Sequence, residues 1–254
     1  MMNWNQLISA KRFGMEEFHE ERQENRSEFQ RDYDRLIFSA PFRRLQNKTQ
    51  VFPLPGSVFV HNRLTHSLEV ASVGRSLGDD VAKALLERHP ELQDSFLPEI
   101  GSIVSAACLA HDLGNPPFGH SGEKAISTFF SEGKGVRLKE KQPNGEQLSP
   151  MEWEDLTHFE GNANAFRILT HQFEGRRKGG FVLTYTTLAS IVKYPFSSSL
   201  AGTKSKFGFF VSEEESFRKI ATELGLILLN EHPLKYARHP LVYLVEAADD
   251  ICYQ

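Results

Sequence analysis

Cysteine is scarce in this sequence, and the scarcity excludes one class of architecture. The 254 residues contain two cysteines, Cys108 and Cys252, and both lie on apolar faces of stretches with helical periodicity. A small secreted fold held together by disulfides needs a larger, regularly spaced set. We therefore expect two buried, reduced thiols in a cytoplasmic protein rather than a disulfide.

Long apolar runs and a secretory signal are also missing. No stretch approaches the roughly 20 apolar residues that a membrane-spanning helix requires. The opening residues, Met-Met-Asn-Trp-Asn-Gln, lack the basic and then apolar pattern of a signal peptide. We expect no membrane partner.

Basic residues are not in excess. The chain has 29 Lys and Arg against 33 Asp and Glu, a formal net charge of −4, which argues against a protein that coats nucleic acid. Its length suffices for a large core in one domain or two small ones. Internal repeats and alternating strands and helices are absent, so the sequence predicts an all-α fold, a compact helical bundle with its site in the core.

Apolar periodicity predicts the main helices. The longest runs from about Asn62 to Arg88 with Asn62 as its N-cap, and a central helix covers residues 100–113. Shorter helices are expected over residues 184–193 and from Pro240. A short strand or hairpin arm is expected over residues 206–211.

Three sequences with the pattern of a capping box predict further helix starts. They lie at residues 149–152, 157–160 and 212–215. The second would open a helix through Phe173, and it would place His158 at a helix N-terminus, where backbone amides favour an anion. The third would open a helix through Leu228.

Composition suggests how the chain is divided. Residues 1–35 read as a charged, solvated N-terminal helix or arm, because residues 11–35 contain few apolar positions. Residues 36–254 then form one domain. Within it, residues 131–149 are rich in Gly, Lys, Glu and Gln and predict an exposed insertion.

Titratable groups are dense in residues 105–123. His111 and Asp112 are adjacent at the end of an apolar run, and residues 114–117, Gly-Asn-Pro-Pro, stop the helix. His120 and Glu123 follow, spaced to share one helix face. Adjacent helical side chains diverge, so His111 and Asp112 alone cannot complete a metal site.

Further ligands must come from other segments, and His66 and Asp249 are the candidates. A lone histidine such as His66 is more often a hydrogen-bonded core residue, and only the second histidine and the carboxylates favour a ligand. Helical phase favours Asp249 over Asp250, which follows Tyr243 and Glu246 on the other face. The residues on the Asp249 face are Val242, Val245 and Cys252.

Two imidazoles and two carboxylates suit a divalent metal ion: Mn, Mg, Fe, Co, Ni or Zn. Such an ion can neutralise phosphoryl oxygens and lower the pKa of bound water from 15.7 toward ~7. His120 can donate a proton to a leaving group, and Glu123 can hold its other ring nitrogen.

These residues resemble the metal-ligand set of the HD-domain phosphohydrolases: His66, the His111-Asp112 pair and Asp249. Five longer blocks resemble the deoxyguanosine-triphosphate triphosphohydrolase (dGTPase and dNTPase) branch, over roughly residues 26–254. They are Phe42–Pro53, His61–Ser67, Gly114–Glu123, His158–Asn162 and Glu246–Asp250.

The resemblance implies hydrolysis of deoxynucleoside triphosphates (dNTPs) to deoxynucleoside and inorganic triphosphate, with His120 protonating the departing 5′-oxygen. It implies that Gln50 reads the deoxyribose 3′-hydroxyl. The substrate-binding positions it implies are Gln50, Arg63, Asn115, His158, Lys193, Tyr194 and Tyr253. A homo-oligomer, and a nucleotide or single-stranded DNA effector, are also typical of relatives, which generally continue well beyond Gln254. We therefore expect an incomplete chain.

Alternatives remain at this stage. Another HD enzyme, such as a 5′-nucleotidase or phosphodiesterase, would share the metal ligands. A regulatory nucleotide or nucleic-acid binder on a degenerate HD scaffold is the second alternative, and the presence of all four ligands counts against it. Individual residues also have structural interpretations: Arg63 as a surface residue, Lys193 as a helix-dipole partner, and Tyr253 as the edge of the core. The sequence does not indicate the preferred base, the metal or the size of the oligomer.

Overall fold

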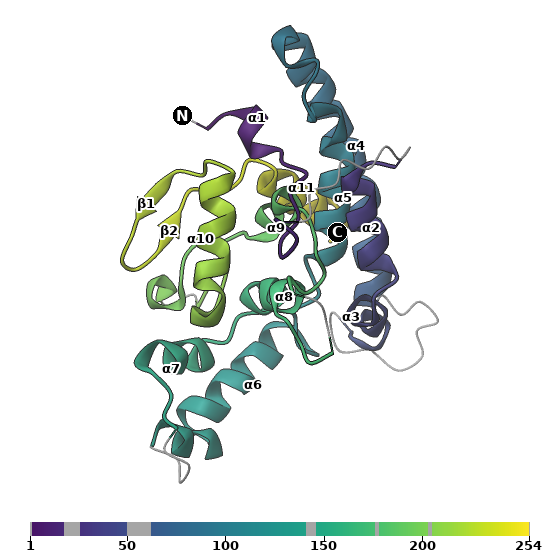
Figure 1. Cartoon of the computed structure of the whole chain (residues 1–254). Coiled ribbons are helices and arrows are strands. Elements are labelled where there is room, and N and C mark those ends of the chain that lie inside the picture. Colours follow the sequence, from purple (N-terminus) through teal and green to yellow (C-terminus); the bar gives the residue numbers. More distant parts are fainter. Residues whose placement is uncertain are drawn as a thin grey trace, which may run out of the picture.

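The computed structural model describes residues 2–17, 26–49, 62–140, 146–175, 178–202 and 205–253. Figure 1 shows helices throughout and one small hairpin at the periphery, which confirms the expected all-α class. The α-helices are α1 (Trp4–Leu7), α2 (Glu28–Ile37), α3 (Ala40–Arg44), α4 (Arg63–Arg88), α5 (Ile100–Ala110), α6 (His120–Ser131), α7 (Pro150–Thr157), α8 (Gly161–Thr170), α9 (Tyr185–Ile191), α10 (Glu214–Glu223) and α11 (Val242–Cys252). Short 3₁₀ turns are η1 (Leu45–Asn47), η2 (Pro90–Leu92), η3 (Leu97–Glu99), η4 (Lys134–Lys139), η5 (Ser198–Leu200) and η7 (Val211–Glu213).

Helix α5 is the centre of the core. All its residues except Ser102 are buried, and it packs against α2, α4, α9 and α11. It lies very close to α4 at one crossing, where a Cβ on Gly78 would lie 2.7 Å from the Gly101 Cα. Glycine is therefore needed at this crossing, and the two helices hold each other at a fixed separation.

The two helices that lead to the candidate site start or end close to their predicted positions. Asn62 caps α4, because its side chain accepts a hydrogen bond from the Thr65 amide at 2.9 Å. Helix α5 ends at Ala110, three residues earlier than predicted, since the chain turns there and the Leu113 amide donates to the Ala110 carbonyl.

Of the three predicted capping boxes, one is confirmed. Ser149 and Glu152 exchange both capping hydrogen bonds at the start of α7. The box at Thr157 is wrong: Thr157 is the last residue of α7, and its hydroxyl donates to the Trp153 carbonyl. Helix α8 is capped instead by the side chain of Glu160, and it ends at Thr170 rather than Phe173.

The predicted cap at Ser212 is also wrong. Helix α10 follows a 3₁₀ turn, its N-cap Glu213 makes no side-chain capping bond, and the helix ends at Glu223, before Leu228. Thr184 caps α9 through the Thr187 amide, and α9 ends two residues before Lys193. Helix α11 begins at Val242, two residues after Pro240.

The strand predicted for residues 206–211 is wrong. Phe207 and Phe209 are both fully buried, and the backbone between them makes one bond, from the Gly208 amide to the Phe196 carbonyl. Burial of aromatic side chains, rather than strand pairing, fixes this segment. The antiparallel hairpin lies further on, in β1 (Leu228–Asn230) and β2 (Lys235–Tyr236).

The N-terminal region is less solvated than predicted. In α2, Phe29, Asp32 and Leu36 are buried, and Arg12 lies 2.7 Å from Asp32. Asp32 also accepts hydrogen bonds from the amide and hydroxyl of Thr184. The solvated-helix interpretation is therefore wrong for α2, whereas the division of domains at residue 35 stays a prediction.

Two further expectations concern the cysteines and the insertion. Both cysteines are free; Cys108 is buried and Cys252 is half-buried. Within residues 131–149, positions 134–139 form the 3₁₀ turn η4 and are mostly exposed, and 141–145 lie outside the described residues. Over the described ranges, no helix combines the length and apolar character needed to cross a membrane.

Candidate active site

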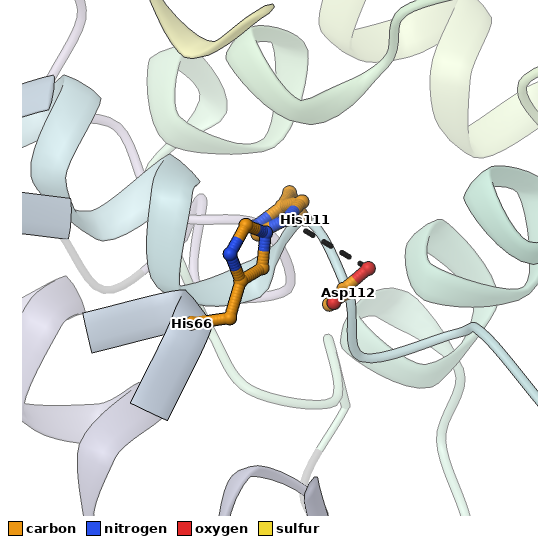
Figure 2. Close-up of side chains that lie close together, drawn as sticks. All are labelled: His66, His111 and Asp112. Carbon is orange, nitrogen blue, oxygen red and sulfur yellow. Dashed lines mark ion pairs between the residues drawn. The ribbon is translucent and has the colours of Figure 1, made fainter. Parts of the chain in front are cut away.

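Three of the predicted metal ligands form one cluster. His66 lies in the first turn of α4, and His111 and Asp112 follow the last residue of α5. One ligand atom from each lies within 4.8 Å of the others. Figure 2 shows the two imidazoles side by side, with Asp112 facing His111 across an ion pair.

Asp249 joins this cluster from α11. Its Oδ1 lies 2.9 Å from His66 Nε2 and 3.6 Å from His111 Nε2, while Asp112 Oδ1 lies 3.7 Å from His111 Nε2. Asp250, the next residue, is exposed. The structure thus brings together the four residues that the sequence selected, with Asp249 rather than Asp250 against the imidazoles.

The arrangement of His111 fits a divalent cation. Its Nδ1 donates to the Cys108 carbonyl at 2.6 Å, which leaves Nε2 as the nitrogen that faces the carboxylates. Nε2 is buried and has no hydrogen-bond partner among the described residues. Burial disfavours the charged imidazole, yet Asp112 and Asp249 outweigh it and raise the pKa of His111 to about 9. A site that attracts a proton so strongly also attracts a metal ion, because both bind the same lone pair.

Both carboxylates are held in place. Arg63 is 6% exposed and its Nη1 lies 2.7 Å from Asp112 Oδ2, while the Asn115 amide donates to Asp112 Oδ1. The interpretation of Arg63 as a surface residue is therefore wrong. Burial would raise the pKa of Asp249, but the adjacent imidazoles of His111 and His66 hold that pKa far below its usual range.

A second imidazole–carboxylate pair lies at the start of α6. His120 Nδ1 is 2.7 Å from Glu123 Oε2, and the His120 side chain is 84% exposed. Glu123 Oε1 accepts the Gly161 amide at 2.8 Å. Burial would raise the pKa of Glu123, but these two hydrogen bonds and the charge of Lys206 lower it below its usual range. The pair joins an ionised carboxylate to an accessible ring nitrogen.

One cavity of about 310 Å³ contains both groups. Its lining includes the four clustered residues, the His120–Glu123 pair, and five of the predicted substrate-binding residues: Arg63, Asn115, Lys193, Tyr194 and Tyr253. A cavity of this size accommodates a small ligand. The cavity wall contains both positive side chains, which suit a phosphate group, and negative side chains, which suit a metal ion.

The remaining two predicted substrate residues differ. Gln50 lies outside the described residues. His158 follows the last residue of α7, with Nδ1 3.1 Å from the Glu154 carbonyl, so the anion site at a helix N-terminus is wrong. His158 is not one of the described residues that line the cavity, and its role in binding substrate stays a prediction.

Sequence reasoning missed two charged residues in the cavity wall. Glu246 pairs with Lys193 and with Arg238, each at 2.9 Å, and Lys206 lies between Glu123 and Glu160. Glu246 stands three residues before Asp249 on α11, but helical phase had grouped it with Tyr243 and Asp250, so the sequence carried no signal for it. Lys206 gives only a weak signal, a single cation beside buried phenylalanines.

Comparison with known proteins agrees with this geometry. Residues 63–179 match the HD domain model. A deoxyguanosinetriphosphate triphosphohydrolase-like protein of Synechocystis sp. is 46% identical over 99% of this chain and 58% of its own length. A protein of the same name from Pseudomonas aeruginosa is 47% identical over 99% of this chain and 55% of its own length. The deoxyguanosinetriphosphate triphosphohydrolase of Yersinia enterocolitica is 36% identical over 99% of this chain and 53% of its own length. The chain thus spans about half the length of these relatives.

Proposed function

The chain belongs to the HD-domain family, and from that premise we propose that it hydrolyses deoxynucleoside triphosphates in a metal-dependent reaction. The products are the deoxynucleoside and inorganic triphosphate. The names of the relatives support a nucleoside triphosphate as the substrate, because they include the words deoxyguanosinetriphosphate triphosphohydrolase. The observation that carries the proposal is a single cavity that holds a histidine–aspartate cluster, whose composition suits a cation, beside an imidazole–carboxylate pair.

Metal binding is proposed for His66, His111, Asp112 and Asp249. The support is the buried Nε2 of His111, which faces two carboxylate oxygens and has no protein hydrogen bond among the described residues. A divalent ion held there would neutralise charge on phosphoryl oxygens and would make a water molecule nucleophilic near neutral pH. Arg63 and Asn115 fix Asp112 in the orientation that this requires.

His120 is proposed as the general acid. Glu123 binds its Nδ1, so Nε2 is the ring nitrogen that delivers the proton to the 5′-oxygen of the leaving deoxynucleoside. The deoxynucleoside alkoxide is a poor leaving group, and its protonation removes the charge that would otherwise build up. The Glu123 carboxylate stabilises the charged imidazole before transfer and keeps the ring in position.

Substrate recognition is proposed for residues around the rest of the cavity. Lys193, paired with Glu246 at 2.9 Å, would exchange that carboxylate for a phosphate oxygen, while Tyr194 and Tyr253 border the sugar and base. Gln50 is the proposed contact of the deoxyribose 3′-hydroxyl, and His158 remains a candidate on the resemblance alone.

The test is the identity of the released product. Purified protein is incubated with each dNTP and Mn²⁺ or Mg²⁺, and anion-exchange chromatography separates triphosphate from orthophosphate and pyrophosphate. We expect stoichiometric triphosphate and deoxynucleoside. Orthophosphate from a deoxynucleoside monophosphate would indicate a 5′-nucleotidase, and opening of a cyclic nucleotide would indicate a phosphodiesterase. Nucleotide binding without turnover would indicate a regulatory protein.

A further inference from the structure

Lys206 occupies a position between two carboxylates in the cavity wall. Its Nζ donates to Glu160 Oε1 at 2.8 Å and lies 3.6 Å from Glu123 Oε2. The second oxygen is the one that faces His120 Nδ1, at 2.7 Å. The charge of Lys206 therefore acts on the same carboxylate oxygen as the imidazole.

Glu160 is the fixed partner of this lysine. It is fully buried, and its oxygens accept hydrogen bonds from the Asn162 amide, the Ala163 amide and the Asn162 side chain. A buried carboxylate needs a compensating cation, and Lys206 supplies it. Glu160 thereby fixes where the charge of Lys206 lies.

The same cap positions the other oxygen of Glu123. Glu160 caps α8 immediately before Gly161, whose amide donates to Glu123 Oε1. A Cβ on Gly161 would lie 3.0 Å from that oxygen and 2.0 Å from Asn115 Oδ1, so only glycine allows this approach. Oε1 of Glu123 is thus positioned by the start of α8, and Oε2 lies in the field of the Lys206 charge.

A cation beside Glu123 weakens the attraction of that carboxylate for a charged imidazole. The imidazole then gives up its proton more readily, as a general acid must. We propose that Lys206 and Glu160 form a charge pair that tunes the acidity of His120 through Glu123. Lys206 is in this sense a positioning residue, and the catalytic meaning of the pair rests on the proposed function.

Other charged or titratable groups line the same cavity as His120 or lie one turn away on α6. The cavity holds Arg63 and His66 on α4, His111 and Asp112 after α5, Lys193 and Tyr194 after α9, Glu246 and Asp249 on α11, and Tyr253 after α11; Lys124 lies four residues after His120 on α6. None of them changes in the variants below, so a difference between variants isolates the Lys206–Glu160 pair.

The experiment compares Lys206→Met, Glu160→Gln and the double variant. The titration midpoint of the His120 imidazole is followed by NMR in the metal-free protein, with His120→Gln to identify the signal. We expect Lys206→Met to raise the midpoint by about half a pH unit to one unit, because a cation is lost. Glu160→Gln should lower it by less, because Lys206 then has Glu123 as its remaining carboxylate partner. The double variant should fall between the two.

Thermal melting of the same three proteins separates structure from tuning. If Lys206 only neutralises a buried carboxylate, both single variants melt lower, the double variant recovers, and the His120 midpoint stays constant in every folded variant. That result overturns the proposal, as does a raised KM for the triphosphate without any shift. If Lys206→Met does not fold, the His120 midpoint of the double variant should still lie above that of Glu160→Gln, because the two proteins differ only in the charge of residue 206.

The activity assay keeps the two proposals apart. In an active enzyme, the pH dependence of kcat should move in the same direction as the midpoint in each variant. Wild-type protein that releases no triphosphate would overturn the proposed function, whereas opposing shifts in its variants would still support the charge coupling.

Discussion

The two halves of the cavity hold their histidines in opposite ways. On the α4–α5–α11 side, the His111 side chain is 13% exposed, its Nδ1 is tied to a backbone carbonyl, and two carboxylates face its other nitrogen. On the α6–α8 side, the His120 side chain is 84% exposed and has one carboxylate partner. A buried imidazole with a fixed tautomer suits a cation, and an accessible one suits proton transfer.

The supports of the two sides differ accordingly. His66 and Asp249 project from α4 and α11, and His111 directly follows α5; these three helices pack on one another through the core. Helix α6, by contrast, has one buried residue, Glu123, and Figure 1 shows it reaching away from α4 and α5 next to α7. Damage to the first side should therefore remove the metal, and damage to the second should remove turnover with the metal still bound.

The largest expected effect is on the core side. Asp249→Ala should lose bound metal and activity together, because it removes a carboxylate that contacts both imidazoles. Asp250→Ala is the matched control, one residue further along α11 and exposed. Metal content by mass spectrometry and triphosphate release are measured on both proteins. Retention of metal by Asp249→Ala, with loss in Asp250→Ala, would contradict the assignment by helical phase.

The next effect is on the α6 side. His120→Ala should keep its metal while turnover of a dNTP falls by about 10²–10⁴, the usual cost of losing acid–base help. The loss should be smaller for a p-nitrophenyl ester, whose phenolate departs without a proton. Glu123→Gln should show a milder form of the same pattern.

Both substrates are measured on one metal-replete preparation. Equal losses on the two esters, together with a lower melting temperature, would make His120 a structural residue of the turn before α6 rather than the acid.

The sequence predicted the two sides unequally, for a physical reason. Apolar periodicity and the Asn62 cap located α4 and α5, because burial of a helix face leaves a local pattern in the sequence. The start of α8 was misplaced, since Thr157 and Glu160 match a capping box but Glu160 is itself the cap. The local sequence does not show whether Thr157 or Glu160 is the cap. The difference comes from Lys206, which is distant in the sequence and neutralises the charge of Glu160.

A third histidine sharpens the contrast with His111. His239 is also buried, but its partners are backbone groups: Nε2 donates to the Leu7 carbonyl, and Nδ1 accepts the Leu241 amide just before α11. Burial lowers the pKa of His239 to about 4, only partly opposed by the bond to Leu7. Without carboxylates, a buried imidazole is neutral and structural.

That neutrality predicts acid sensitivity. Above pH ~6.5 both folded and unfolded chains carry neutral His239, and its contribution is complete. As the pH falls, the unfolded chain takes up a proton that the folded chain refuses until about pH 4. Between pH 6.5 and 4.5 the free energy of unfolding should drop by about 2–3 kcal/mol from this group. Urea titrations of wild type and His239→Gln measure it, and an equal drop in both would exclude His239 as the source.

The smallest expected effect tests the capping of the α6–α8 side. Ser149→Ala removes the hydroxyl that accepts the Glu152 amide, and should cost about 1 kcal/mol of unfolding free energy. Thr157→Ala removes a hydroxyl that donates to a carbonyl one turn back, at the end of the same helix, so it should cost clearly less. The two sites share a sequence pattern and differ in geometry alone.

If the two variants lose stability equally, the sequence pattern rather than the observed cap would describe this region, and the start of α8 at Gly161 would need revision. A larger loss at Ser149 would support a cap supplied by Glu160, on which the position of Glu123 depends.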